Sequence, residues 1–424
     1  MTERTTGEQR PVDEHADTKQ TVDAWVETVT ALWPGAEVEL VRPGSAGDLV
    51  RPGSAGGPAR HGRELAFLPD ARRPRLLLPS NRGAAAAALR RYSHDLSIPQ
   101  RLSRGLTATA LRTGIPQRTL RDRLRVTTGG QESVEDRLGE LLGRPVVVSL
   151  GLGTARANRK PILHVLSASG RPVAFVKVGD TATARELVAQ EAAALRYLAG
   201  RPMPGVAVPE VLHHGPWRGM SLLVLSPLPT SARGWRPRRS APVAAMRALF
   251  AVAGLSGGPL AGSPFWHRIV TVPAQLTDSA RAARLTTVID RVGAAHGERA
   301  LEFGAWHGDW TPWNMAWHRG TVQLWDWERF TREVPAGLDL LHYRLQEAMR
   351  HAPGEPYGAW PDGAVATLAE FDVTDGAAEA TVELYFLELC CRYLLAAQGP
   401  IGAPLRSQAD RLLNLLETKA GRSS

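Results

Sequence analysis

The feature that most constrains the fold is a run of three short β-type segments before the middle of the chain. The first segment is a run of β-branched residues, which favour extended structure. The segments are Val146 to Leu150, Leu163 to Ser167 and Val173 to Val178. A Ser-Gly-Arg sequence between the last two is typical of a hairpin turn. The pattern therefore predicts three successive antiparallel strands.

One helix is predicted after these strands, followed by a large helical part. The helix has a leucine stripe at helical spacing, made of Leu187, Leu195 and Leu198. Thr183 and Glu186 fit a capping box at its start. A strand at 222–225 follows, and later a pair of short β segments at 315–317 and 322–325 interrupts the helical pattern. This order predicts the α+β class, with a small antiparallel β lobe, one helix and a large, mostly helical lobe.

The N-terminal third differs from the rest of the chain in charge. Residues 1–41 hold nine acidic and three basic residues, whereas residues 42–130 hold seventeen Arg, no Lys and five acidic residues. A basic segment attracts nucleic acid and other anions. Only Phe67 and Tyr92 are aromatic there, which argues against stacking on bases. Compositional bias toward Arg explains the segment equally well.

Four regions are predicted from these patterns. Residues 62–130 form a small basic α+β module of unknown role, with a hairpin around the turn 69–73 and an Ala-rich helix at 82–94. The others are an acidic disordered tail, short helix and Pro/Gly linker at 1–61, a β lobe with its connector at 131–228, and a helical lobe at 229–424.

Apolar patterning favours a cytoplasmic protein without a membrane span. The most apolar stretch, 384–397, is interrupted by Glu388 and Arg392. The N-terminus shows no secretory or transit pattern. Cys390 and Cys391 are adjacent in a helical pattern, where they resemble small buried hydrophobic residues and not a disulfide or a metal site.

A short motif in the helical half carries the chemistry. The sequence Trp-His-Gly-Asp-Trp-Thr-Pro-Trp-Asn-Met at 306–315 places Asp309 and Asn314 five residues apart, just before the β pair that leads to Asp326. Phosphoryl transfer needs a carboxylate beside the acceptor hydroxyl and oxygen ligands for Mg²⁺. Since these three residues supply such groups, they predict a phosphoryl-transfer site.

A lysine and a glutamate nearer the N-terminus fit the same chemistry. Lys177 ends the third predicted strand, and Glu191 lies on the predicted helix. A strand lysine bound to phosphate and held by a helix carboxylate is the ion pair that such sites need. Alone, each residue is more typical of a surface charge. Glu186 is a competing partner for the lysine.

These residues, in this order, resemble the aminoglycoside phosphotransferase and choline kinase family, which shares the protein kinase fold. The resemblance covers residues 146–345 and implies a bilobal kinase-like fold that uses ATP and Mg²⁺. It implies that Asp309 is the catalytic base or orients the acceptor, and that Asn314 and Asp326 bind the metal.

The resemblance also implies roles around the nucleotide. Lys177 would contact the phosphates with Glu191 orienting it, and backbone groups near Ser226 and Leu228 would hold the adenine. Gly151 and Gly153 belong to an incomplete glycine-rich loop whose backbone amides would cover the phosphates.

Further residues near the motif have structural interpretations. The resemblance implies that Asp339 braces the catalytic loop and that His307 forms structural hydrogen bonds instead of acting as a base. Glu328 either assists the metal site or caps a turn. Trp310 and Trp313 either pack in the core or line an acceptor pocket.

Two departures from protein kinases favour a small-molecule acceptor. Gly308 stands where regulated kinases have Arg, and Asp-Trp-Glu at 326–328 replaces Asp-Phe-Gly. The predicted function is therefore ATP-dependent transfer of phosphate to a hydroxyl of a sugar, an amino alcohol or an aminoglycoside. The oligomeric state and a preference for ATP over GTP stay open.

Two alternatives remain. One is a non-catalytic kinase-like scaffold or regulatory protein that docks through its basic N-terminal module, although the intact site residues argue against it. The other is nucleic-acid binding, which rests on charge alone.

Overall fold

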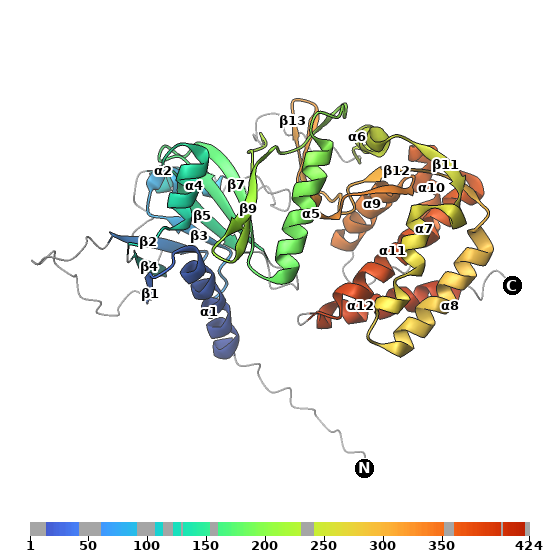
Figure 1. Ribbon diagram of the computed structural model, residues 1–424, viewed down its shortest axis with the longest axis horizontal. Helices are drawn as coiled ribbons and strands as arrows, with labels where there is room; N and C mark the ends of the chain where they lie inside the picture. Colours follow the sequence, from blue (N-terminus) through green and yellow to red (C-terminus); the bar gives the residue numbers. More distant parts are fainter. Residues whose placement is uncertain are drawn as a thin grey trace, which may run out of the picture. The chain divides into compact units, whose positions relative to one another are not determined.

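The structure is a computed structural model that describes residues 14–41, 61–90, 107–112, 122–128, 130–152, 160–229, 241–351, 360–399 and 402–419. It divides into two compact units (Figure 1). Unit 1 comprises residues 1–91, 97–154 and 160–178, and unit 2 comprises residues 92–96, 155–159 and 179–424. The predicted domain bounds at 61, 130 and 228 divide the chain differently and stay predictions.

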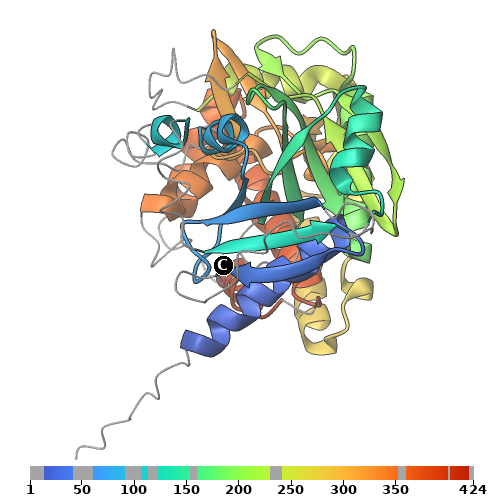
Figure 2. The same ribbon diagram turned by 90° about the vertical axis from the view of Figure 1, so that its left-hand side faces the viewer.

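Unit 1 is built on an antiparallel sheet, seen in blue to green in Figure 2. Seven of its described strands have the order β1-β4-β2-β3-β5-β6-β7. Their bounds are Glu37–Val41 (β1), His61–Leu68 (β2), Leu76–Pro79 (β3), Arg123–Thr128 (β4), Val147–Leu152 (β5), Pro161–Leu166 (β6) and Pro172–Gly179 (β7). The three predicted strands are confirmed as β5, β6 and β7. The sheet continues across residue 131, because β3 pairs with β5.

Three helices of unit 1 accompany this sheet: α1 (Glu14–Leu32), α2 (Arg82–Leu89) and α4 (Val134–Leu142). Trp25, Val29 and Leu32 of α1 share one helix face and are buried. Trp25 meets Phe67 of β2 edge to face, with ring centroids 6.0 Å apart. The disorder predicted for the acidic tail is wrong for residues 14–20, which belong to α1.

The predicted hairpin and Ala-rich helix are confirmed as β2–β3 and as α2 over 82–89. Residues 91–94 of that helix, residues 1–13 and residues 42–58 of the predicted Pro/Gly linker lie outside the described residues. The predicted turn between β6 and β7 contains Gly170, with φ of 81°. A Cβ there would lie 2.3 Å from the Gly83 carbonyl oxygen, so only glycine allows the turn to approach α2.

Part of the basic charge of unit 1 is paired within its sheet. Arg123 Nη1 lies 2.7 Å from Glu64 Oε2, and Arg125 lies 3.5 Å from both Glu39 and Glu64. These groups are substantially exposed, so each pair contributes about 0–1 kcal/mol. Some of the arginines of this segment therefore form ion pairs between neighbouring strands.

Unit 2 begins with the predicted helix, α5 (Ala182–Leu198), whose leucine stripe is buried as predicted. The predicted capping box is wrong: Thr181 caps the helix, its hydroxyl accepting from the Ala184 N–H, and Glu186 is exposed. The strand predicted at 222–225 is β10 (Met220–Leu225), which pairs with β9 (Val211–Trp217).

The rest of unit 2 is mainly helical, as predicted. Its other α-helices are α6 (Val243–Phe250), α7 (Pro264–Val270), α8 (Ser279–His296), α9 (Leu338–His351), α10 (Trp360–Leu368), α11 (Asp375–Ala396) and α12 (Ala403–Lys419). The predicted hairpin is β13 (Met315–His318) with β14 (Thr321–Leu324), and β8 (Val206–Ala207) joins β14. The pattern missed a second small sheet of β11 (Ser256–Pro259), β12 (Ala300–Trp306) and β15 (Thr331–Pro335). The α+β class is confirmed.

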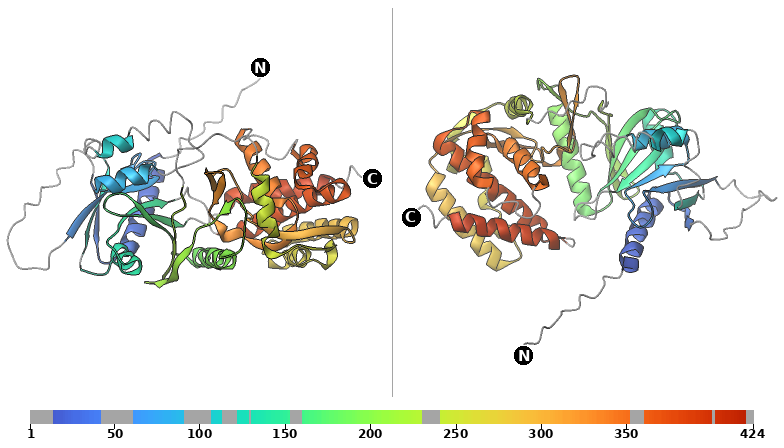
Figure 3. Two further views of the ribbon diagram at one scale, coloured as in Figure 1. Left: turned by 90° about the horizontal axis from the view of Figure 1, so that it is seen from above. Right: turned by 180° about the vertical axis from the view of Figure 1, so that it is seen from behind.

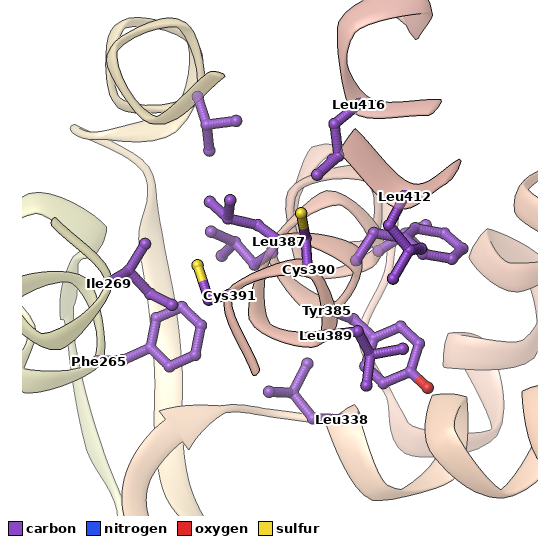
Figure 4. Close-up of a cluster of buried hydrophobic side chains, with 14 of the residues drawn as sticks. Phe265, Ile269, Leu338, Tyr385, Leu387, Leu389, Cys390, Cys391, Leu412 and Leu416 are labelled. Atoms are coloured by element: carbon purple, nitrogen blue, oxygen red, sulfur yellow. The ribbon is translucent and has the colours of Figure 1, made fainter. Parts of the chain in front are cut away.

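The core of unit 2 lies among α7, α8, α9, α11 and α12. Helices α8, α11 and α12 pack side by side (Figure 3). Cys390 and Cys391 of α11 are free and buried in this core, near Phe265, Ile269 and Leu412 (Figure 4). The prediction that both cysteines are small buried hydrophobic residues is confirmed, and burial raises the pKa of the Cys390 thiol to about 12.

Across the described ranges of the chain, no helix combines the length and apolarity that crossing a membrane requires.

Candidate active site

The predicted catalytic residues lie on the loop 307–314, between β12 and β13 of unit 2. The β13–β14 hairpin follows this loop directly. At the far end of the hairpin, the Trp325 N–H donates to the Asn314 carbonyl at 3.1 Å. The hairpin therefore returns the chain so that Asp326 acts electrostatically on Asp309.

Asp309 and Asn314 contact each other through their side chains. Nδ2 of Asn314 donates to Oδ2 of Asp309 at 2.9 Å and to the Asp309 carbonyl at 3.0 Å. Both hydrogens of the amide are thus directed at Asp309. Among the described residues, no donor contacts Oδ1 of Asn314, so this oxygen is available to a ligand from outside the protein.

The carboxylate of Asp309 is half-exposed and ionised. Burial would raise its pKa, but the hydrogen bond from His342 is the largest opposing effect, and the pKa lies below its ordinary value. Nε2 of His342 lies 3.1 Å from Oδ1 of Asp309. With 37% of its side chain exposed, Asp309 is accessible and can accept a proton from a bound hydroxyl.

His307 is fully buried and neutral. Its Nδ1 accepts from the Asp309 N–H at 3.1 Å, so Nε2 carries the hydrogen and donates to the Trp325 carbonyl at 3.1 Å. Burial lowers the pKa of His307 to about 4. Since both ring nitrogens are engaged with backbone, the predicted structural role of His307 is confirmed.

Replacing His307 by Phe is expected to destabilise unit 2 by about 2–4 kcal/mol, because the part-buried Asp309 N–H and Trp325 carbonyl each lose their partner. The ring contact with Trp327, at 4.6 Å between centroids, would survive. The midpoint of denaturant unfolding measured by Trp fluorescence checks this result. Replacement of the exposed His267 by Phe is the control and should change the midpoint little.

We also predict that the stability difference between the wild type and His307→Phe depends on pH. The folded pKa of His307 lies below the ordinary value, so its contribution to stability is full above about pH 6.5 and is lost as pH falls toward about 4. The stability difference between the wild type and His307→Phe should narrow over this window. A constant difference would contradict a neutral, buried His307.

Asp339 braces the catalytic loop from the first turn of α9. Its Oδ2 accepts from the His307 N–H at 2.7 Å, and its Oδ1 accepts from the Gly308 N–H at 3.0 Å. Burial raises the pKa of Asp339 to about 7, against the opposing effect of these hydrogen bonds. The predicted structural role is confirmed.

The backbone conformation and the lack of space at position 308 exclude the arginine that regulated kinases have there. Its φ is 79°, and a Cβ at this position would lie 2.5 Å from the Arg329 carbonyl oxygen. A residue with a side chain would therefore be strained and would clash. The Gly308 carbonyl instead accepts from Arg392 of α11 at 2.7 Å, and Glu388 holds Arg392 at 3.4 Å.

Three carboxylates form a candidate metal site. The ligand oxygens of Glu191, Asp326 and Glu328 lie within 4.8 Å of one another. Asp326 has a φ of 76°, and η5 (Trp327–Arg329) begins directly after it. Glu191 is fully buried, and its Oε1 accepts from the Trp327 N–H at 3.3 Å. Oxygen ligands of this kind suit Mg²⁺, and a cation would offset the repulsion between the carboxylates.

The structure gives less information on the residues that are predicted to bind the nucleotide from the β lobe. Lys177 is buried on β7 in unit 1, whereas Glu191 belongs to unit 2, so their pairing stays a prediction. Gly151 lies in β5, where a Cβ would make only ordinary contacts of 3.7 and 3.8 Å. Gly153 lies outside the described residues.

In the connector after β10, one backbone N–H already forms a hydrogen bond within the protein. The Ser226 N–H donates to the Glu210 carbonyl at 2.9 Å, and the Ser226 hydroxyl accepts from the Glu210 N–H at 2.8 Å. This N–H is therefore not offered to a nucleotide base. The predicted use of other backbone groups at Ser226 and Leu228 stays a prediction.

The tryptophans of the motif divide between core and partly exposed positions. Trp310 is fully buried, with Nε1 3.4 Å from the Met315 sulfur, whereas Trp313 is half-buried. Trp327 lies in η5, directly after Asp326, and is fully buried.

The motif search missed three residues that contact the catalytic loop or support it. His342 and Tyr385 come from α9 and α11, and Arg392 was noted only as an interruption of an apolar helix. His342 lies three residues after Asp339, on the same face of a helix, and that spacing is the one sequence signal that could have identified it.

A protein-family model matches the segment that contains this site. Residues 163–337 match the APH phosphotransferase enzyme family. The predicted resemblance is confirmed, and together with the observed order of elements it confirms the predicted kinase-like fold. The segment includes Lys177, Glu191, Asp309, Asn314 and Asp326, and it excludes Gly151 and Gly153. The family match supports a small-molecule phosphotransferase.

Solved structures of similar fold include several kinases. The aminoglycoside phosphotransferase APH(4)-Ia, in complex with ADP and hygromycin B, shares 15% identity over 67% of this chain and 98% of its own, with a TM-score of 0.44. Choline kinase from Cryptosporidium parvum Iowa II shares 11% identity over 65% of this chain and 89% of its own, also with a TM-score of 0.44. No curated protein matches the sequence significantly.

Proposed function

We propose that this chain is an ATP-dependent phosphotransferase that phosphorylates a hydroxyl of a small molecule. The observation that carries the proposal is the geometry of Asp309, an ionised and accessible carboxylate whose Oδ2 accepts from Asn314 at 2.9 Å. The match of residues 163–337 to the APH phosphotransferase family supports it. An ATP-consuming reaction also fits the predicted cytoplasmic location.

The residues divide the reaction between them. The acceptor oxygen forms a bond to the γ-phosphorus, the bond from the γ-phosphorus to the bridging oxygen breaks, and ADP leaves. Asp309 orients the acceptor hydroxyl and takes its proton. Lys177 binds the phosphates of the nucleotide. His307 and Asp339 hold the backbone of the catalytic loop, so that Asp309 needs little reorganisation.

The donor set fits a Mg²⁺ cofactor. Asn314 has Oδ1 available, and Asp326 lies within a cluster of carboxylate oxygens that includes Glu191 and Glu328. We propose that Asn314 and Asp326 hold the ion. When bound, Mg²⁺ would neutralise negative charge on the phosphates.

The charges around Asp309 bear on the acceptor. Burial, and then the charge of Arg392, lower the pKa of Arg329 to about 10, and Asp309 acts on the same guanidinium. Arg268 lies 2.8 Å from Glu388, which also contacts Arg392. A polycation would meet these arginines, so we propose a neutral or anionic hydroxyl compound as acceptor in preference to an aminoglycoside.

The test is a coupled assay of ADP release with Mg²⁺ and ATP, without an acceptor and with panels of sugars, amino alcohols, hydroxy acids and aminoglycosides. We expect slow release without acceptor, loss of release with EDTA, and faster release with one neutral or anionic panel. Phosphorus NMR of that mixture should show a new phosphomonoester. Absence of ADP release in every one of these mixtures would contradict the proposal, and calorimetric binding of ATP without release would favour the non-catalytic scaffold.

A further inference from the structure

A histidine and a tyrosine form a hydrogen-bonded chain that ends on the Asp309 carboxylate. Nε2 of His342 lies 3.1 Å from Oδ1 of Asp309, and Nδ1 lies 3.0 Å from the Tyr385 hydroxyl. His342 is 3% exposed and Tyr385 is fully buried. His342 lies beyond residues 163–337, which match the family model.

The chemistry of Asp309 and Tyr385 determines which atoms carry the hydrogens in these two hydrogen bonds. An ionised carboxylate only accepts hydrogen bonds, so Nε2 of His342 carries a hydrogen and donates to Asp309. Burial lowers the pKa of His342 below its ordinary value, which keeps the ring neutral. Nδ1 then accepts from the Tyr385 O–H. The tyrosine therefore selects one tautomer of the histidine.

The residues around His342 and Tyr385 hold these two side chains in place. The Tyr385 ring packs in the core of unit 2 near Leu338 and Leu389, and its hydroxyl points away from the two cysteines (Figure 4). The other charged or titratable groups that act on His342 or are acted on by it are Arg392 of α11, Arg329 of η5 and His307 of the loop. None of these accepts the Nε2 hydrogen, which is directed at Asp309.

The two oxygens of Asp309 are thus held by different elements. Oδ1 accepts from His342 of α9, and Oδ2 accepts from Asn314 of the catalytic loop. One hydrogen bond to each oxygen fixes the plane of the carboxylate. Each oxygen keeps a lone pair for the acceptor hydroxyl.

We propose that His342 is a positioning residue that orients the Asp309 carboxylate toward the acceptor, with Tyr385 setting its tautomer. This inference rests on the proposed function, because it assigns His342 a part in the same reaction. A misplaced catalytic group costs about 10²-fold in rate. The effect should therefore appear in kcat and not in the KM for ATP.

The first experiment measures Mg²⁺-dependent ATP turnover by four variants. His342→Phe fills the space without a donor and should lower kcat about 10²-fold, whereas His342→Gln keeps a donor and should retain most of the activity. Tyr385→Phe should have an intermediate effect. His267→Gln, at an exposed histidine of the same unit, should equal the wild type. Equal losses in His342→Gln and His342→Phe, or no loss in either, would overturn the proposal.

The second experiment does not need turnover. Nitrogen-15 NMR of histidine-labelled protein, with the His342 signal assigned from His342→Gln, reports the tautomer of the ring. We expect the neutral Nε2–H form in the wild type and a mixture of tautomers in Tyr385→Phe. An Nδ1–H form in the wild type would overturn the proposal. If the wild type lacks turnover, the proposed function fails, and the NMR result still decides the state of His342.

Discussion

Replacement of Asp309 by Asn should lower Mg²⁺-dependent ATP turnover by about 10²–10⁴-fold, the usual contribution of a positioned general base. An amide cannot take the proton of the acceptor hydroxyl. It would also place a donor opposite either Asn314 Nδ2 or His342 Nε2, both of which donate to the carboxylate. The measurement is ADP release, without acceptor and with any acceptor that accelerates it.

The control for this prediction is Asp290→Asn on α8, which changes an exposed aspartate of the same unit. It should leave turnover unchanged. Asp309→Asn should bind ATP as the wild type does, because the carboxylate is assigned to the acceptor side. Undiminished turnover in Asp309→Asn would contradict its role. ATP binding without turnover in the wild type would favour the non-catalytic scaffold.

Replacement of Asp326 by Asn should raise the Mg²⁺ concentration for half-maximal turnover by about 10- to 100-fold, the usual effect of weakening a metal site. Asn tolerates a φ of 76°, so the backbone should survive the change. One fewer charge beside Glu191 and Glu328 should also leave the metal-free protein at least as stable as the wild type. Calorimetric titration with Mn²⁺, in the presence of a non-hydrolysable ATP analogue, measures the affinity directly.

Two further variants make this test specific. Glu186→Gln changes an exposed carboxylate five residues before Glu191 on α5, and it should leave metal affinity unchanged. Glu328→Gln decides between the two interpretations of that residue: it weakens metal binding if Glu328 is a ligand and has no effect if it only caps η5. Unchanged Mn²⁺ affinity in Asp326→Asn would contradict the assignment of the metal site.

Sequence periodicity predicted the elements whose burial follows a simple repeat. The β5, β6 and β7 strands, the leucine stripe of α5 and the β13–β14 hairpin are all confirmed, because each has a local pattern of apolar or turn residues. The sheet of β11, β12 and β15 was missed. Its edge strand β11 reads Ser-Gly-Gly-Pro, which has no strand propensity of its own and pairs only because β12 lies beside it.

The N-cap of α5 is a second feature that the local sequence pattern did not predict correctly. Thr181 and Thr183 both lie near the start of α5, and Thr183 has the capping-box partner Glu186 in sequence. The chain leaves β7 at Gly179, where a Cβ would lie 2.7 Å from the Cα of Arg185. This close approach makes the helix begin two residues earlier than the capping box predicts, so Thr181 becomes the cap.

The sequence by itself determined which residues form the candidate site. Asp309, Asn314 and Asp326 are recognisable because their spacing is local, and the hairpin between them is short enough to bring them together in any fold that contains it. The structural roles of His307 and Asp339 came instead from the resemblance to the aminoglycoside phosphotransferase and choline kinase family.

Only the tertiary structure decided how these groups are held. His342, Tyr385 and Arg392 reach the loop from α9 and α11, and Glu191 reaches the carboxylate cluster from α5, more than a hundred residues away from Asp326. Apart from the three-residue spacing of Asp339 and His342, no local pattern indicates these contacts, because a helix periodicity specifies which face is buried and not what that face contacts. The packing of α9 and α11 against the loop therefore sets the orientation of the Asp309 carboxylate.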